Sequence, residues 1–205
     1  MTAQTWMLFC VTEIILCLIP GPAVLLVLST ALRGGFSRAT VAAGGILTSN
    51  TFYFALSATG IAAVIVASHS VFTAIKWAGA AYLVWLGLRM LLTRPAQHDD
   101  SPPAGAETRE RVFMRAFLVQ SSNPKSLIFF VALLPQFISP NAAVPRQILI
   151  LGITSVVIEF AVLSVYAALA SRARKVAGSR FSNSLERIGG GVLIAAGARL
   201  AWIRG

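Results

Sequence analysis

The sequence predicts an all-α polytopic membrane protein. Apolar residues make up 57% of the 205 positions and charged residues only 12%, which is too few charges to cover a soluble domain of this size. Apolar runs of about 20 residues recur, and each is long enough to cross roughly 30 Å of hydrocarbon. Proline-containing breaks interrupt two of these runs. These observations favour one membrane domain of six helices, of which the first and fourth are broken.

We expect the six spanning helices at residues 5–32, 39–67, 71–92, 112–138, 146–171 and 184–203. The first run has no basic region before it and no small-residue cleavage site, so we expect it to persist as a helix rather than be removed as a signal peptide. Residues 93–110 are polar and rich in proline and aspartate, which indicates a linker. It joins a first three-helix repeat, 1–92, to a second, 111–205. Three helices in each repeat make the two repeats inverted in topology.

Basic residues predict the orientation, because those near helix ends are retained on the cytoplasmic side. The net charge is +10, and arginine and lysine gather in the connections after the first, third and fifth helices. We therefore expect these loops, and the linker among them, in the cytoplasm of a bacterial inner-membrane protein, with both termini outside. Nucleic-acid binding is disfavoured, because it would need a basic face with interleaved aromatic residues.

The two helix breaks are the main functional signal. Pro20, Gly21 and Pro22 interrupt the first helix, and Asn123 and Pro124 interrupt the fourth. Proline removes a backbone donor and clashes with the preceding turn, so each helix must kink or unwind. One such break is more often a tolerated kink. Two at corresponding places in inverted repeats indicate a substrate site near the midplane, where the broken ends expose amides and carbonyls.

Charged residues within the spans add to this signal. Lys125 follows the second break, and a cation at that depth costs a few kcal/mol, so it persists where it is paired or functional, unless it snorkels to the headgroups. Glu13 and Glu159 could pair with Lys125, bind a substrate ammonium or carry a proton, although Glu13 could also face the outer headgroups. Asn50 falls opposite the neighbourhood of Glu159 when the repeats are aligned. The predicted substrate-binding residues are Pro20, Gly21, Pro22, Asn50, Asn123, Pro124, Lys125 and Glu159, with Glu13 and Glu159 as proton-coupling candidates.

The sequence offers little for catalysis or metal binding. His69 and His98 fall in predicted loops, and no cluster of Cys, His and carboxylate residues occurs within a span. The serines of the spans have no intramembrane histidine beside them, which disfavours an intramembrane enzyme. A non-transporting scaffold would leave the paired breaks without a use. We expect no cofactor, and the many glycines favour close helix packing, with a homodimer as a second use of one glycine-lined face.

Three stretches resemble the LysE/RhtB superfamily of amino-acid exporters. Residues 20–27 (PGPAVLLV) resemble its first-helix signature, residues 76–83 (KWAGAAYL) its third-helix block, and residues 123–125 (NPK) with 134–137 (LPQF) its second-half signature. The resemblance covers nearly the whole chain. It implies six helices and the efflux of an amino acid or derivative by antiport with protons. An exporter of another small metabolite or ion is the alternative.

The chain departs from the family pattern at two places. Ala23 stands where many relatives have Asp or Asn, and Ser49 and Asn50 stand where a glycine and an acidic residue are frequent. These departures leave Glu13 and Glu159 as the local candidates for the proton carrier.

Overall fold

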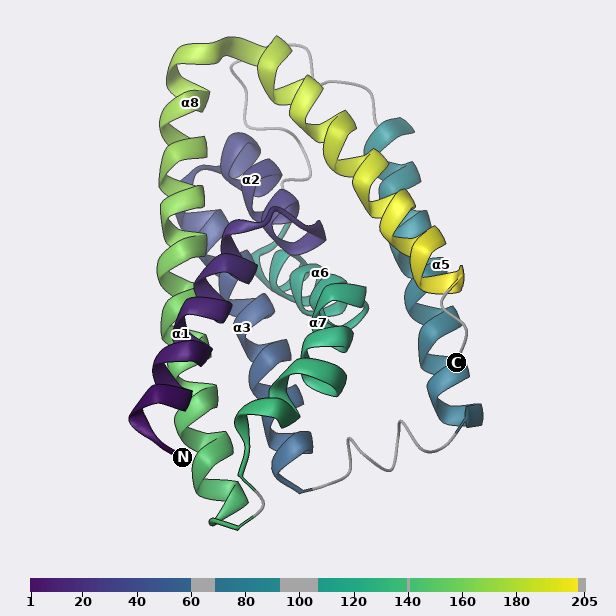
Figure 1. Ribbon diagram of the computed structural model, residues 1–205. Coiled ribbons are helices and arrows are strands. Elements are labelled where there is room, and N and C mark those ends of the chain that lie inside the picture. The colour runs from purple at the N-terminus through teal and green to yellow at the C-terminus, as the bar shows by residue number, and fades with distance from the viewer. Residues whose placement is uncertain (60–68, 93–106, 140, 203–205) are drawn as a thin grey trace.

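The computed structural model describes residues 1–59, 69–92, 107–139 and 141–202, and the regular elements in these ranges are all helical. They are α1 (Ala3–Leu18), α2 (Pro22–Gly34), α3 (Phe36–Ala58), α5 (His69–Leu92), α6 (Arg109–Ser121), α7 (Pro124–Ile128), the π-helical turn η1 (Phe129–Leu133), the 3₁₀ turn η2 (Leu134–Phe137) and α8 (Val144–Trp202). Figure 1 shows how these helices are arranged. The prediction of an all-α protein is confirmed for the described residues.

The first predicted helix is broken where its prolines predict. α1 ends at Leu18, and Ile19 takes an extended conformation. α2 then begins with Pro22 as its first residue, where the missing N–H of proline has no partner to lose. The two helices meet at an angle of 54°.

The fourth predicted helix is divided into more pieces than the sequence suggests. α6 ends at Ser121, and Asn123 caps α7 by accepting a hydrogen bond from the backbone N–H of Lys125 at 3.1 Å. The chain then widens into η1 and tightens into η2, which contains Pro135. Such π-helical turns often lie at functional sites.

Several predicted boundaries require correction. The helices expected at 146–171 and 184–203 belong to one continuous element, α8, because the polar segment between them contains no proline and its backbone stays helical. In Figure 1 this element runs along α1, α2 and α3, turns at the top of the view and returns beside α5. His69, expected in a loop, is the first residue of α5. The polar linker ends at Thr108, which caps α6, and residues 93–106 of it lie outside the described residues.

α3 and α6 pack together closely. At Gly45 an added Cβ would lie 3.1 Å from the Cβ of Ala116 and would overlap the carbonyl oxygen of Phe113. The neighbouring Gly44 has no comparable constraint, since its nearest atom is a ring carbon of Phe113 at 3.8 Å. Only a residue without a side chain fits at Gly45, so this glycine sets the distance between the two helices.

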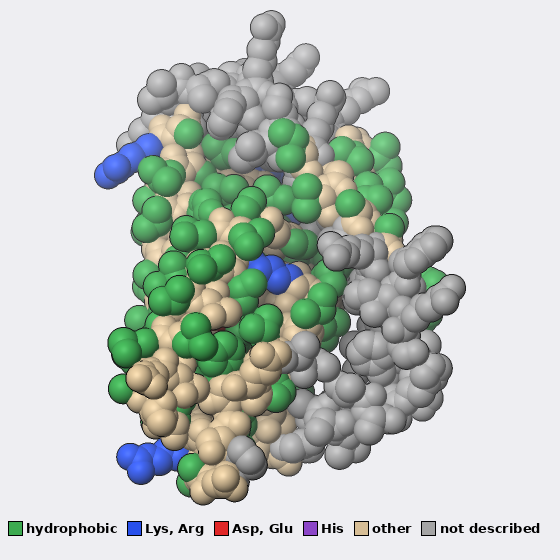
Figure 2. All heavy atoms as spheres, viewed as in Figure 1, with side chains coloured by type: hydrophobic (Ala, Val, Ile, Leu, Met, Phe, Trp, Pro, Cys, Tyr) green, Lys and Arg blue, Asp and Glu red, His purple; other side chains and the backbone are tan. Residues whose placement is uncertain are grey.

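The described surface is largely apolar. Met7, Leu8 and Val11 of α1 are exposed, as are Ile153 and Val157 of α8. Figure 2 shows many hydrophobic side chains on the described part of one face, with basic side chains near its upper and lower ends and one near its centre. Among the described residues, the segment Val144–Ala173 is by itself long and apolar enough to cross a bilayer, and α1 with α2 qualifies as a bent pair. The predicted six crossings in two repeats therefore stay a prediction.

Candidate functional site

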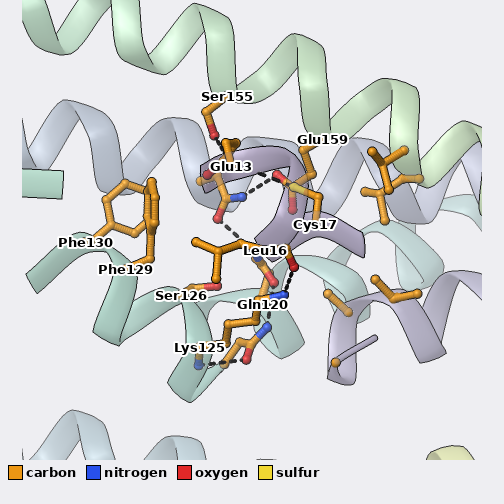
Figure 3. A pocket seen from close by; sticks show the side chains of 17 residues that line it. Glu13, Leu16, Cys17, Gln120, Lys125, Ser126, Phe129, Phe130, Ser155 and Glu159 are labelled. Carbon is orange, nitrogen blue, oxygen red and sulfur yellow. Dashed lines mark hydrogen bonds between the residues drawn. The ribbon is translucent and has the colours of Figure 1, made fainter. Parts of the chain in front are cut away.

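A cavity of about 60 Å³ lies where the two helix breaks meet. A buried water needs roughly 10–15 Å³ by this kind of measure, so the cavity has room for several waters or a small polar molecule. Figure 3 shows side chains from α1, α6, α7 and α8 converging on it. Its lining residues are Glu13, Leu16, Cys17, Gly21, Ala23, Val24, Asn50, Gln120, Asn123, Lys125, Ser126, Phe129, Phe130, Ser155, Glu159, Val162 and Leu163.

Glu13 faces this cavity rather than the headgroups. Its side chain is only 5% exposed, and its Oε1 accepts a 2.5 Å hydrogen bond from the hydroxyl of Ser155 on α8. Cys17, one turn further along α1, lies with its sulfur 4.0 Å from the same oxygen. A carboxylate buried this far needs such partners, and this burial argues against the alternative that Glu13 faces the outer headgroups.

Lys125 joins the second break to the first. Its ammonium donates hydrogen bonds to the carbonyl oxygens of Leu16 and Ile19, the latter at 3.0 Å. The Leu16 carbonyl also accepts from the backbone N–H of Ile19 at 3.3 Å, and carbonyls at a helix C-terminus carry the negative end of the helix dipole. The lysine therefore neutralises the end of α1 from a position on α7.

A chain of side-chain amides connects Lys125 to Glu159. The backbone N–H of Lys125 donates to Asn123 Oδ1 at 3.1 Å, and Asn123 Nδ2 donates to Gln120 Oε1 at 3.1 Å. Gln120 Nε2 donates to Asn50 Oδ1 at 2.8 Å, and Asn50 Nδ2 donates to Glu159 Oε2 at 2.5 Å. The three amide side chains and Glu159 are all buried. We call Asn123, Gln120 and Asn50 the amide chain.

Two tyrosines complete the ends of the broken helices. The hydroxyl of Tyr166 on α8 donates to the carbonyl of Leu18, the last residue of α1, at 3.0 Å. The hydroxyl of Tyr53 on α3 donates to the carbonyl of Ser121, the last residue of α6, at 2.6 Å. Both breaks thus end in a carbonyl that a tyrosine from a distant helix satisfies.

An aromatic wall closes one side of the cavity. Phe129 and Phe130 lie edge to face with ring centroids 5.0 Å apart, and Phe130 also packs on Phe54 with centroids 4.9 Å apart. The site therefore combines two carboxylates and an ammonium with an apolar wall that has room for a small aliphatic group.

The predicted site residues divide into two groups. Most of them line the cavity: Glu13, Gly21, Asn50, Asn123, Lys125 and Glu159. The prolines Pro20, Pro22 and Pro124 are not among its lining residues and act through the backbone, by ending and starting the half-helices. Contact between the cargo and these residues stays a prediction.

Sequence reasoning missed Gln120, Ser155, Cys17 and the two tyrosines. Spacing gave a usable signal for two of them: Ser155 precedes Glu159 by one helical turn and so shares its face, and Gln120 lies just before the second break. For the tyrosines no local signal exists, because their partners are more than 60 positions away, with separations of 68 and 148 residues.

Residues 14–203 match the family model described as LysE type translocator. The chain belongs to the LysE translocator family. It is therefore a membrane transporter and not an enzyme. Within the family it is 35% identical to a homoserine/homoserine lactone efflux protein of Salmonella typhimurium, over 100% of this chain and 99% of that protein. No solved structure matches it.

Two further relatives of this LysE translocator are informative. A leucine efflux protein of Klebsiella pneumoniae is 31% identical over 78% of this chain and 76% of its own length. An uncharacterized membrane protein of Vibrio cholerae is 32% identical over 98% of both chains. The family that the proline and NPK motifs resemble is thus confirmed.

Proposed function

We propose that this LysE translocator exports an amino acid or a close derivative across the bacterial inner membrane, driven by the proton gradient. The observation that carries the proposal is the convergence of Glu13, Glu159 and Lys125 on one cavity at the junction of the two breaks. A zwitterion presents an ammonium and a carboxylate a few ångströms apart, and this cavity offers charges of both signs. The efflux functions in the names of the relatives support the same cargo class.

In this proposal the cargo lies between α1, α2 and α8. Its ammonium contacts Glu13 or Glu159. Its carboxylate contacts Lys125 and the first turn of α2, where Ala23 and Val24 line the cavity and the positive end of the helix dipole favours an anion. A small aliphatic side chain then packs on Phe129 and Phe130.

Proton coupling falls to the two carboxylates. Glu13 and Glu159 each bind either a cargo ammonium or a proton. Cargo and protons therefore compete for these carboxylates and cross the membrane in opposite directions. We further propose six crossings in two inverted repeats, with both termini outside and one repeat rocking against the other to alternate access.

Cys17 offers a test within the natural sequence, because it lines the cavity and the chain has only one other cysteine, Cys10. In a Cys10→Ser protein in liposomes, leucine or homoserine should slow the alkylation of Cys17 by N-ethylmaleimide at least several-fold. The same amino acids should be exported by wild type in response to an imposed pH gradient. Glu159→Gln should abolish this pH-driven export. If no amino acid protects Cys17 or is transported, the proposed cargo class is wrong.

One observation favours, within this cargo class, a derivative without a free carboxylate. Lys125 already donates to the carbonyls of Leu16 and Ile19, so a cationic amine without a carboxylate would use the two glutamates alone. Homoserine lactone has this chemistry, and it appears in the name of one relative. Export of the lactone with no export of homoserine would favour the derivative over the free amino acid.

A further inference from the structure

The direction of every hydrogen bond in the amide chain is fixed from one end. The backbone N–H of Lys125 can only donate, so the group of Asn123 that faces it is Oδ1. Asn123 must then present Nδ2 to Gln120, and the same requirement passes through Gln120 to Asn50. The last group in the chain, Asn50 Nδ2, can only donate, and its partner is Glu159 Oε2. Hydrogen bonds aligned in one direction polarise and strengthen one another.

This alignment distinguishes the two oxygens of Glu159. Oε2 faces a fixed donor, so a proton placed on it would bring two donors together. Among the described residues Oε1 has no hydrogen-bond partner. A proton or a cargo ammonium would therefore be taken by Oε1, while Oε2 stays bound to Asn50.

We propose that Gln120 is a positioning residue for Glu159. Through Asn50 it holds Oε2 and leaves Oε1 for the exchanging proton or ammonium, and through Asn123 it ties the same carboxylate to the cap of α7 at the second break. A change in the protonation or binding of Glu159 then alters the hydrogen bonds at the second break, although Glu159 does not contact the break directly. This inference rests on the proposed function for the exchange itself, whereas the positioning depends only on the amide chain.

The test must include the other charged or titratable groups that face Glu159. These are Glu13 and Cys17 from α1 and Lys125 from α7, while α3 and α6 contribute the neutral Asn50 and Gln120. Titration of Glu13 could produce a pH effect on transport that resembles one from Glu159. For this reason the readout must report on the Glu159 carboxyl itself rather than on transport.

The experiment is difference infrared spectroscopy of the full chain in liposomes across a pH series. The carboxyl band of Glu159 is the one that disappears in Glu159→Gln. In Gln120→Met, which keeps the length of the side chain but not its amide, we expect this band to shift in frequency.

Gln147→Met is the matched control. Gln147 is also a buried glutamine, 3% exposed, but its amide bonds the backbone of Ser139 and Ala142, away from the amide chain. It should leave the Glu159 band unchanged. Asn50→Leu should shift the band by itself and remove any further effect of Gln120→Met, because the amide chain reaches Glu159 only through Asn50.

Gln120→Asn, which is one methylene shorter, replaces Gln120→Met if that variant does not fold. An unchanged Glu159 band in the Gln120 variant, or an equal shift in Gln147→Met, overturns the positioning role. The infrared result is independent of cargo. A shifted band with no transport of leucine, homoserine or homoserine lactone would therefore leave the positioning intact and overturn the proposed function instead.

Discussion

Among single residues, Lys125 stands out because it makes hydrogen bonds at both helix breaks. Its backbone N–H donates to Asn123, the cap of α7 at the second break, and its ammonium donates to carbonyls at the end of α1 in the first. A cargo carboxylate that contacts Lys125 would compete with these carbonyls. Cargo binding at this residue would therefore loosen the end of α1, which is a physical route from occupancy to movement.

Lys125→Met should both destabilise the protein and abolish export. The loss of charge-assisted hydrogen bonds to two carbonyls should lower the free energy of unfolding by about 1–3 kcal/mol. Chemical unfolding in detergent measures the change in stability, and export of leucine from liposomes measures the loss of transport. Arg146→Met, at an exposed arginine in the first turn of α8, is the control and should change neither. Normal export by a stable Lys125→Met protein would exclude the carboxylate role.

The tyrosine caps also act at single positions. Tyr53→Phe and Tyr166→Phe each leave one helix-end carbonyl without its hydroxyl donor. Each should lower the free energy of unfolding by about 1 kcal/mol, measured by the same unfolding experiment. Thr51→Val serves as comparison, because the hydroxyl of Thr51 bonds only the carbonyl of Leu47 in its own helix. Equal effects of all three variants would mean that the caps have no special role.

At the level of elements, the contact between α3 and α6 positions the site. Asn50 lies on α3 and Gln120 on α6, so the 2.8 Å bond between them depends on how closely these helices approach. Gly45 sets that approach, one and a half turns before Asn50. A packing residue is thereby linked to the hydrogen bonds of the cavity.

Gly45→Ala should separate the two helices, and Gly44→Ala should not. The first variant places a methyl group against the backbone of α6, which should destabilise by about 1–3 kcal/mol. The second removes a flexible residue from a helix interior and should be neutral or stabilise by up to about 1 kcal/mol. Thermal unfolding of the two purified proteins measures the difference. A Gly45→Ala protein as stable as Gly44→Ala would contradict the close packing.

At the level of the whole molecule, contacts cross between the two halves of the chain. Tyr53 lies in the first half and caps a helix of the second, while Tyr166 lies in the second half and caps a helix of the first. Glu159 and Lys125, both in the second half, contact Asn50 and the end of α1 in the first. If one half rocks against the other, as we propose, these contacts are the ones that must exchange.

The predicted orientation can be tested on the intact chain. A reporter fused after Gly205 should lie outside the cytoplasm, because the basic loops hold the opposite side inside. Alkaline phosphatase at this position should be active in cells, and green fluorescent protein should be dark. A fluorescent fusion with inactive phosphatase would place the C-terminus in the cytoplasm and reverse the proposed direction of the repeats.

The sequence alone determined that the protein lies in a bilayer, which family it belongs to and where the two proline-containing helix breaks fall. Hydropathy is summed along the chain, and proline acts on its own backbone, so both effects are local and can be read without a fold. The same reasoning found Glu13, Lys125 and Glu159, because ionisable residues are costly in an apolar run wherever that run packs.

Tertiary structure decided how these residues are partnered. The bond from Asn50 to Glu159 spans 109 positions, and the contact between Lys125 and the end of α1 spans 106. Gln120 and Ser155 are ordinary polar residues in the sequence and gain a role only from the neighbours that packing gives them. Hydrogen bonds depend on distance and angle between side chains, and those are fixed by helix packing rather than by position in the chain.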